Sequence, residues 1–261
     1  MPHDVAAALA TAPGVRWGVA LRDAATDELL LGHAADDVLP TASVGKLLLL
    51  VAAARRDGDA LLQRDSVAPV ADSGLWQHLH VETLPLHDCA ALVGAVSDNL
   101  ATNVLLAHVG LTAVDAVADE LGLADTRLHD AVRDVRGPEH PPTLSTGTAA
   151  ELTALLARLH RDEVDGARQV LRWLAPGADL SMVAAAFGLD PLAHVAADRG
   201  LRVVAKTGTD RGLRADVGLA SGPAGTVAYA VLAHWDDDVD RRDDVLEAMR
   251  AIGRVVRRHV E

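Results

Sequence analysis

The sequence contains little cysteine, few aromatic residues, less positive than negative charge and no long apolar run, and each shortage excludes something. Cys89 is the only cysteine among 261 residues, so no disulfide can form within the chain. It lies in the apolar stretch 89–93, where a lone cysteine is most often a small buried hydrophobic residue. Aromatic residues make up 2% of the chain, so leucine, valine and alanine must fill the core.

The balance of charge and hydropathy argues against two kinds of partner. Lys and Arg number 24 against 37 Asp and Glu, which gives a formal net charge of -13. Nucleic-acid binding needs a concentrated basic face, and anionic membrane surfaces also attract basic segments. The longest apolar run, residues 47–54, is too short to span a bilayer. We therefore expect no nucleic-acid partner and no membrane partner.

The first ten residues lack the features of an export signal. They have no basic start and no long apolar stretch. The sequence as written therefore predicts a cytoplasmic protein, or a secreted or periplasmic one if a leader was trimmed from it. We expect the protein to act as a monomer.

Strand patterns occur at both ends of the chain, and helical patterns fill the middle. The segments with strand character are residues 15–21, 29–31, 201–205, 215–220 and 226–234. Residues 43–56 are apolar on nearly all sides, which predicts a buried central helix. An amphipathic helix from about Val239 ends the chain.

These elements predict one α/β (α+β) domain spanning residues 1–261. The end segments, about 1–40 and 198–261, pair into one antiparallel sheet with the terminal helices packed on it. Residues 41–197 or so form a helical subdomain. We expect the active site in the cleft between the two parts, where pockets often form.

Three short motifs carry the chemistry, and Ser43-Val44-Gly45-Lys46 is the first of them. On a helix, Ser43 and Lys46 share one face. The free N–H groups and positive end of the helix would favour an oxyanion at Ser43. Burial would lower the pKa of Lys46 and let it act as a base. The alternative is that Ser43 caps a buried helix and Lys46 sits on its rim.

The other two motifs are Ser97-Asp98-Asn99 and Lys206-Thr207-Gly208. The first precedes a helical segment, so it could also be an ordinary helix N-cap. The second follows an apolar strand, and a glycine at Gly208 lets a substrate approach the backbone closely. An ordinary β-turn with an exposed lysine is the alternative for that stretch.

In this order the three motifs resemble those of the class A β-lactamases and their relatives among the penicillin-binding proteins. Asn103 and the stretch 121–128 also look like the corresponding family segments. The resemblance covers nearly the whole chain. It implies a five-stranded antiparallel sheet flanked by terminal helices, an all-helical subdomain and an active site between them. It also implies a serine hydrolase that works through an acyl-enzyme.

The resemblance assigns catalytic roles to four side chains, those of Ser43, Lys46, Ser97 and Lys206. Ser43 attacks an amide or ester carbonyl, Lys46 takes its proton, and Ser97 passes a proton to the leaving nitrogen. Lys206 and Thr207 bind a carboxylate of the small-molecule substrate.

Other residues are expected to position the substrate. Asn99 hydrogen-bonds the amide side chain of the substrate, and the N–H groups of Ser43 and Thr209 form the oxyanion hole. Arg214 resembles the second carboxylate-binding cation of the family, with a spacing one residue shorter. Trp76, in the segment 72–77, is either a wall of the cleft or a plain core or surface residue.

Neither a metal nor a cofactor is expected. Of the 12 histidines, His78 and His80 lie one residue apart, as zinc ligands can. No further ligands match a zinc pattern, so we interpret the histidines as scattered surface residues.

One family feature is missing from the sequence. Class A β-lactamases carry a Glu on the loop after the stretch 121–128, and it activates the water that releases the acylated serine. Here the expected position falls on Val132, and the carboxylates that could replace that Glu are Asp134 and Glu139. Without a base for water the acyl-enzyme should persist, since such a base is worth about 10²–10⁴-fold.

The sequence therefore predicts a serine hydrolase of the class A β-lactamase type, acylated at Ser43 by a β-lactam or a related amide or ester. An esterase or D-Ala-D-Ala peptidase on the same scaffold is the first alternative. A non-turnover protein that binds acyl ligands is the second, and a biosynthetic role on another metabolite is the third.

Overall fold

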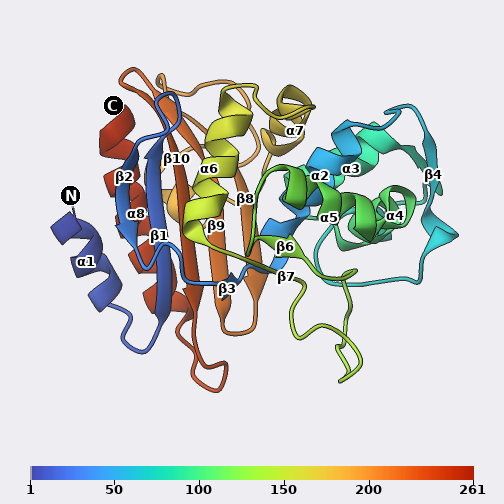
Figure 1. The fold of residues 1–261 in the computed structure, drawn as a ribbon, viewed down its shortest axis with the longest axis horizontal. Coiled ribbons are helices and arrows are strands. Elements are labelled where there is room, and N and C mark those ends of the chain that lie inside the picture. The colour runs from blue at the N-terminus through green and yellow to red at the C-terminus, as the bar shows by residue number, and fades with distance from the viewer. Residues whose placement is uncertain (1) are drawn as a thin grey trace.

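A computed structural model describes residues 2–261, and its largest element is one antiparallel sheet built from both ends of the chain (Figure 1). The five strands lie in the order β2-β1-β10-β9-β8. Their bounds are Arg16–Asp23 (β1), Leu29–His33 (β2), Arg202–Asp210 (β8), Leu213–Gly222 (β9) and Gly225–His234 (β10). The expected five-stranded antiparallel sheet is confirmed, and β8 forms one of its edges.

The register of β8 fixes where the third motif points. A tight turn at Gly212, whose φ of +63° favours glycine, joins β8 to β9. Successive side chains of a strand alternate between its two faces. Lys206 and Gly208 therefore lie on one face of the sheet, and Thr207 and Thr209 lie on the other.

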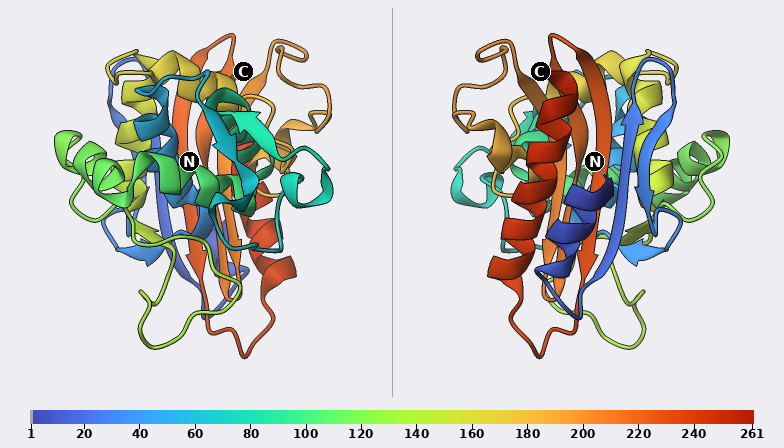
Figure 2. Two further views of the ribbon diagram at one scale, coloured as in Figure 1. Left: turned by 90° about the vertical axis from the view of Figure 1, so that its right-hand side faces the viewer. Right: turned by 90° about the vertical axis from the view of Figure 1, so that its left-hand side faces the viewer.

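Helices cover both faces of the sheet. On one face α1 (Pro2–Ala10) and α8 (Arg242–Val260) lie side by side (Figure 2), joined by an ion pair of 2.6 Å between Arg258 and Asp4. On the other face α6 (Ala149–His160) packs against β1, β9 and β10. Helix α6 falls within the stretch 41–197 that was expected to form the separate subdomain, yet it covers the sheet.

The rest of the middle of the chain forms the helical part. A 3-10 turn η1 (Ala42–Gly45) leads into α2 (Lys46–Ala54), whose residues 46–53 are all buried, so the predicted central helix is present. Around it lie α3 (Leu86–Val96), α4 (Asn99–Val109), α5 (Leu111–Glu120) and α7 (Ala167–Leu174).

Short strands and turns, which the sequence pattern did not predict, complete this part. A three-stranded sheet contains β3 (Leu39–Pro40), β7 (Ser145–Gly147) and β6 (Arg127–Leu128), and a two-stranded sheet contains β4 (Leu61–Gln63) and β5 (Thr83–Pro85). The remaining 3-10 turns are η2 (Arg64–Ser66), η3 (Trp76–His78) and η4 (Val183–Phe187). A long loop joins β6 to β7 beside the sheet edge (Figure 1).

The large sheet separates two apolar cores. Along β10, Ala230 and Leu232 belong to the core around α2, whereas Tyr229 and Val231 belong to the core around α8. Because both faces of the strand are covered, it is apolar at nearly every position.

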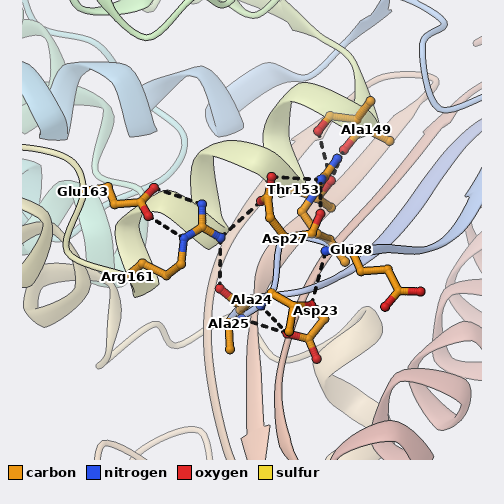
Figure 3. A network of polar contacts seen from close by, with 12 residues as sticks. Asp23, Ala24, Ala25, Asp27, Glu28, Ala149, Thr153, Arg161 and Glu163 are labelled. Carbon is orange, nitrogen blue, oxygen red and sulfur yellow. Dashed lines mark hydrogen bonds and ion pairs between the residues drawn. The ribbon is translucent and has the colours of Figure 1, made fainter.

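A polar network ties the end of α6 to the turn between β1 and β2 (Figure 3). The guanidinium of Arg161 donates to the carbonyl of Ala24 and to a carboxylate oxygen of Asp27, each at 3.1 Å. It also pairs with Glu163 at 2.7 Å. The network anchors the first hairpin to the helix that covers it.

No single helix of the described chain is long and apolar enough to cross a membrane. The pair α4 and α5, bent by 82°, would pass the same test of length and composition only when taken together.

Candidate active site

A cavity of about 920 Å³ lies where the sheet edge meets the helical part. Residues of all three motifs line it, namely Ser43, Ser97, Asn99, Lys206 and Thr207, together with Thr209. The structure thus brings together three stretches that lie far apart in the sequence.

The turn that carries Ser43 is held in a strained conformation. Ala42, the residue before it, has a φ of +47°, which costs a non-glycine residue roughly 1–3 kcal/mol. The buried Ser145 of β7 fixes this turn: its hydroxyl lies 2.6 Å from the carbonyl of Ala42 and 2.7 Å from the hydroxyl of Thr41. Ser43 is therefore positioned by contacts from outside its own helix.

Ser43 lies in η1, one turn before α2 begins at Lys46. Side chains three residues apart eclipse one another in a 3-10 helix, so Ser43 and Lys46 still share one side. Neither η1 nor α2 has a side-chain cap at its N-terminus. The alternative in which Ser43 serves as the helix cap is therefore wrong.

The amine of Lys46 is fully buried and surrounded by oxygen atoms. Nζ donates to the carbonyl of Ser97 at 2.7 Å, to its hydroxyl at 3.2 Å and to Oδ1 of Asn99 at 2.9 Å. Burial, and next the charge of Lys206, hold the pKa of Lys46 well below its ordinary value. No carboxylate of the described chain bonds this amine, so it can lose its proton and act as a base.

The three residues of the second motif make different contacts. Asp98 caps α4 through the N–H of Ala101, and its other carboxylate oxygen accepts from the N–H groups of Leu75 and Trp76. Ser97 is left-handed, with a φ of +55°, at the junction of α3 and α4. The cap is thus Asp98 alone, which leaves the side chains of Ser97 and Asn99 to contact the lysines.

Lys206 contacts the same hydroxyl of Ser97. Its Nζ lies 3.0 Å from the Ser97 hydroxyl and 2.9 Å from the carbonyl of Thr207, and the side chain is almost fully buried. Burial lowers the pKa of Lys206 to about 8, against the opposing charges of Asp179 and Asp216. The hydroxyl of Ser97 therefore sits between two amines.

Gly208 is required for a reason other than the expected one. A Cβ atom there would lie 2.2 Å from the carbonyl oxygen of Thr41 and 3.3 Å from the backbone nitrogen of Ser43. The glycine thus allows β8 to pack against the backbone of η1, rather than only making room for a substrate. This contact places the backbones of Ser43 and β8 at one wall of the cavity.

Four predicted site residues do not line the cavity, namely Lys46, Gly208, Trp76 and Arg214. Trp76 is fully buried in the helical core and donates through Nε1 to the carbonyl of Val81 at 2.9 Å. Its interpretation as a wall of the cleft is wrong, and the core alternative holds. Arg214 lies opposite Thr209 on β9, and its guanidinium donates to the carbonyls of Asp210 and Leu213.

The loop after β6 carries Val132, which occupies the position where class A β-lactamases have the Glu. Val132 lines the cavity. The side chain of Asn103 makes two hydrogen bonds to its backbone, donating to the carbonyl at 2.9 Å and accepting from the N–H at 2.8 Å. Asp134 also lines the cavity, with Oδ1 accepting from the N–H of Ala71 at 3.0 Å. Glu139 is exposed beside His140 and does not line the cavity.

Several cavity residues were not predicted. Ser73 donates to the carbonyl of Ser97 at 2.9 Å, and Asp72, Asp179 and Asp210 also line the wall. They lie on loops, where no periodicity marks a residue as facing inward. Within residues 2–261 the single cluster of candidate metal ligands is the exposed run 236–238, which lies outside the cavity.

Comparison with known families agrees with this geometry. The model of the β-lactamase enzyme family matches residues 3–260. The chain belongs to this family. It is therefore a hydrolase of the β-lactamase type, and the predicted resemblance is confirmed.

Solved structures share the fold over nearly the full length of each chain. The β-lactamase of Sphaerobacter thermophilus is 26% identical, with a TM-score of 0.80 and 97% of both chains covered. An ancestral class A β-lactamase is 24% identical, with a TM-score of 0.81 and 98% of both chains covered. PBP-A is 19% identical, with a TM-score of 0.78 over 99% of this chain and 97% of its own. No curated protein matches the sequence.

Proposed function

We propose that the protein is a serine hydrolase that is acylated at Ser43 by a β-lactam or a related amide or ester. The observation that carries the proposal is the position of the Ser97 hydroxyl, 3.2 Å from Nζ of Lys46 and 3.0 Å from Nζ of Lys206, in the cavity that Ser43 lines. This arrangement provides a nucleophile, a base and a route for a proton.

Acylation follows from these groups in a fixed order. Neutral Lys46 takes the proton of Ser43 as Oγ bonds to the substrate carbonyl carbon. Backbone N–H groups of Ser43 and Thr209 stabilise the oxyanion, each worth roughly 3–4 kcal/mol. The carbon–nitrogen bond then breaks, and the proton passes from Lys46 through the Ser97 hydroxyl to the leaving nitrogen. The product is an ester at Ser43. The amine stays attached to the acyl group when the substrate is a β-lactam, and it is released when the substrate is a linear amide.

Release of the acyl group is the slow step in this proposal. Val132 offers no base for water, and Asp130 is engaged by both Arg133 and Arg136 at 2.7 and 2.9 Å. Asp134 lines the cavity, but one of its carboxylate oxygens accepts from the N–H of Ala71 at 3.0 Å. A positioned base is worth about 10²–10⁴-fold, so its absence lengthens the life of the acyl-enzyme by a comparable factor. An acyl-enzyme complex with penicillin G is known for a PBP-A mutant of the same fold, with 20% identity and a TM-score of 0.78.

Intact-protein mass spectrometry after mixing with benzylpenicillin tests the proposal. We expect a stoichiometric adduct that decays over minutes to hours, and none with Ser43→Ala. The exposed Ser66→Ala, on η2, serves as the control and should form the adduct normally. A folded wild-type protein that forms no adduct and turns over no β-lactam would overturn the proposal.

The absence of a base at position 132 also favours a second candidate, an esterase or D-Ala-D-Ala peptidase on the same scaffold. Such an enzyme uses the same acylation groups but releases its acyl group to other acceptors or from better substrates. Turnover of a p-nitrophenyl ester much faster than that of nitrocefin would favour this candidate. The reverse order would favour a β-lactamase.

A further inference from the structure

Two asparagines of α4 hold two different loops of the cavity wall. Asn99 and Asn103 are four residues apart, which places them one turn apart on the same side of the helix. Nδ2 of Asn99 donates to the carbonyl of Ala71 at 3.0 Å, and the side chain of Asn103 bonds the backbone of Val132. Ala71 and Val132 both line the cavity, and their loops lie far apart in the sequence.

Asp134 joins these two loops to each other. Its Oδ1 accepts from the N–H of Ala71 at 3.0 Å, and it follows two residues after Val132. The contacts form a closed ring, which runs from α4 through Asn99 to Ala71 and across to Asp134. The ring returns to α4 through Val132 and Asn103.

Asn99 is the member of this ring that reaches the proposed reaction. Its Oδ1 accepts from Nζ of Lys46 at 2.9 Å, and one N–H of its Nδ2 goes to Ala71. The other N–H is left for the amide of a substrate, as the family resemblance implies. If the side-chain amide turned over, its N–H groups would face the amine of Lys46. The carbonyl of Ala71 opposes this because it accepts a hydrogen bond only from the nitrogen.

The position of Ala71 is not set by regular secondary structure. It lies in the segment 67–75, between η2 and η3, which is neither helix nor strand. The next residue, Asp72, has a φ of +69°, in the left-handed region that non-glycine residues seldom adopt. Within the described chain, the hydrogen bonds of the Ala71 backbone go to the side chains of Asn99 and Asp134. Removing the carboxylate would leave this backbone held from one side.

The loop that carries Asp134 is braced on both sides of it. Asp130, whose side chain is 12% exposed, pairs with Arg133 at 2.7 Å and with Arg136 at 2.9 Å. These ion pairs and the bonds from Asn103 order the loop around Asp134. Its bond to the neighbouring segment therefore costs little additional conformational entropy, although the residue is exposed.

We propose that Asp134 is a positioning residue for acylation, and that it acts by holding Ala71 and thereby the amide of Asn99. The inference rests on the proposed acylation of Ser43. The role requires a hydrogen-bond acceptor at position 134 and not a negative charge. This requirement separates it from the role of a base for water.

Two substitutions at Asp134 test that requirement. Asp134→Ala removes the acceptor, and we expect the second-order rate constant for acylation by benzylpenicillin to fall about tenfold, the equivalent of one hydrogen bond to a charged group. Asp134→Asn keeps Oδ1 as a neutral acceptor, so its rate constant should stay within about threefold of the wild type. The amide proton of Ala71 should exchange with solvent faster in the Ala variant than in the Asn variant.

Asp57→Ala is the matched control. It removes a carboxylate that accepts from the backbone N–H of Asp59 at 3.1 Å, in a turn outside the cavity. This variant should be acylated at the wild-type rate. Urea denaturation of every variant, run alongside, shows that the rate constants refer to folded protein.

A double-mutant cycle tests the route through Asn99. In the Asn99→Ala background the amide that Ala71 orients is gone, so the further change Asp134→Ala should alter the acylation rate by less than about twofold. A general loosening of the loop would instead lower the rate by the same factor in both backgrounds.

The outcomes separate this inference from the proposal on which it rests. If Asp134→Ala is acylated at the wild-type rate, or Asp134→Asn falls as far as Asp134→Ala, the inference is wrong and the proposed function stands. The same holds if the full loss persists in the Asn99→Ala background. It also holds if Asp134→Asn mainly lengthens the life of the adduct, which would make the carboxylate a base for water. If the folded wild type forms no adduct with benzylpenicillin, both fail.

Discussion

The hydroxyl of Ser97 governs what the two lysines can do, because both amines contact it. Nζ of Lys46 and Nζ of Lys206 lie 3.2 and 3.0 Å from this one oxygen, and both side chains are buried. Two ammonium groups so placed repel each other, so the pair tends to hold fewer than two charges. In the proposed mechanism Lys46 is therefore the base, and Lys206 keeps its proton to bind an anionic group.

The charge of Lys206 predicts an alkaline limit to acylation. Its pKa of about 8 means that the ammonium is present below that pH and is lost as the pH rises through it. The rate constant for acylation by benzylpenicillin, whose carboxylate needs this charge, should therefore decline above about pH 8. Stopped-flow measurements across the range would show it. In Lys206→Arg the decline should move to higher pH, and a wild-type profile that stays flat would contradict the assignment.

The clamped backbone of Val132 predicts a gain of function. Asn103 fixes this residue in the cavity wall, so Val132→Glu should place a carboxylate near the ester carbon of the acyl-enzyme. We expect the half-life of the benzylpenicillin adduct to shorten by about 10²-fold or more.

Val132→Gln is the matched control for this variant. It has the same shape but no base, so its adduct should be as long-lived as that of the wild type. Equal half-lives for the Glu and Gln variants would show that the position does not reach the ester.

At the level of residues, the motifs were predictable and the loops were not. Ser43 and Lys46 were paired by their local spacing and Ser97 by the resemblance of its motif, and the structure brings Ser97 to Lys46 and to the cavity that Ser43 lines. Trp76 was misplaced because its position depends on how its loop folds over Asp98, a contact 22 residues away. No local pattern reveals such a contact.

Among the elements, the contact between β8 and η1 builds the site. The strand lies at the sheet edge, and the backbone of Gly208 packs against η1, the turn that carries Ser43. Edge strands normally present unpaired backbone groups, and here part of that edge faces the cavity. The helical part and the sheet thus meet through main-chain atoms, which are stiffer than side chains.

This contact predicts a large effect of a small change. In Gly208→Ala the new methyl would overlap the carbonyl of Thr41 at 2.2 Å, and a backbone neighbour cannot rotate away. We expect a loss of about 1–3 kcal/mol in the free energy of unfolding, measured by urea denaturation, and a marked fall in acylation rate.

Gly225→Ala offers a control, since it has open space around it although its φ of +141° adds backbone strain. It should cost stability without changing the acylation rate of the folded protein. Wild-type acylation by Gly208→Ala would show that the contact is not needed for the site.

The elements of the sheet were predicted well because strand alternation and turn signals are local. The predicted strand segments 201–205, 215–220 and 226–234 overlap β8, β9 and β10. The role of α6 was not predictable in the same way. Its apolar face suits either core, and only the assembled fold decides which one it covers.

Across the whole molecule, the buried carboxyl of Asp216 links the sheet to η4. Its oxygens accept from the N–H of Val183 at 2.9 Å and the hydroxyl of Tyr229 at 3.0 Å. Burial, and next the charge of Asp179, raise its pKa to about 7. The folded protein therefore holds a proton there that the unfolded chain releases near its ordinary pKa of about 3.9.

This proton makes the stability depend on pH. Between about pH 4 and 7 the folded state binds the proton and the unfolded state does not, so stability falls as the pH rises. The loss amounts to at most about 4 kcal/mol. Urea unfolding of the wild type and of Asp216→Asn at several pH values should show a steeper decline in the wild type. Parallel pH dependences would mean that the carboxyl is ionised throughout.

The order of the strands along the chain also has a consequence for synthesis. β1 ends at Asp23 and β8 begins at Arg202, although both belong to the same sheet. At roughly 5–20 residues per second, a ribosome needs about 10 to 40 s to make the stretch between them. During that time the edge of β1 that β10 will occupy is open to other nascent chains. The first hairpin therefore stays exposed while the helical part is synthesised, until the strands that complete the sheet follow.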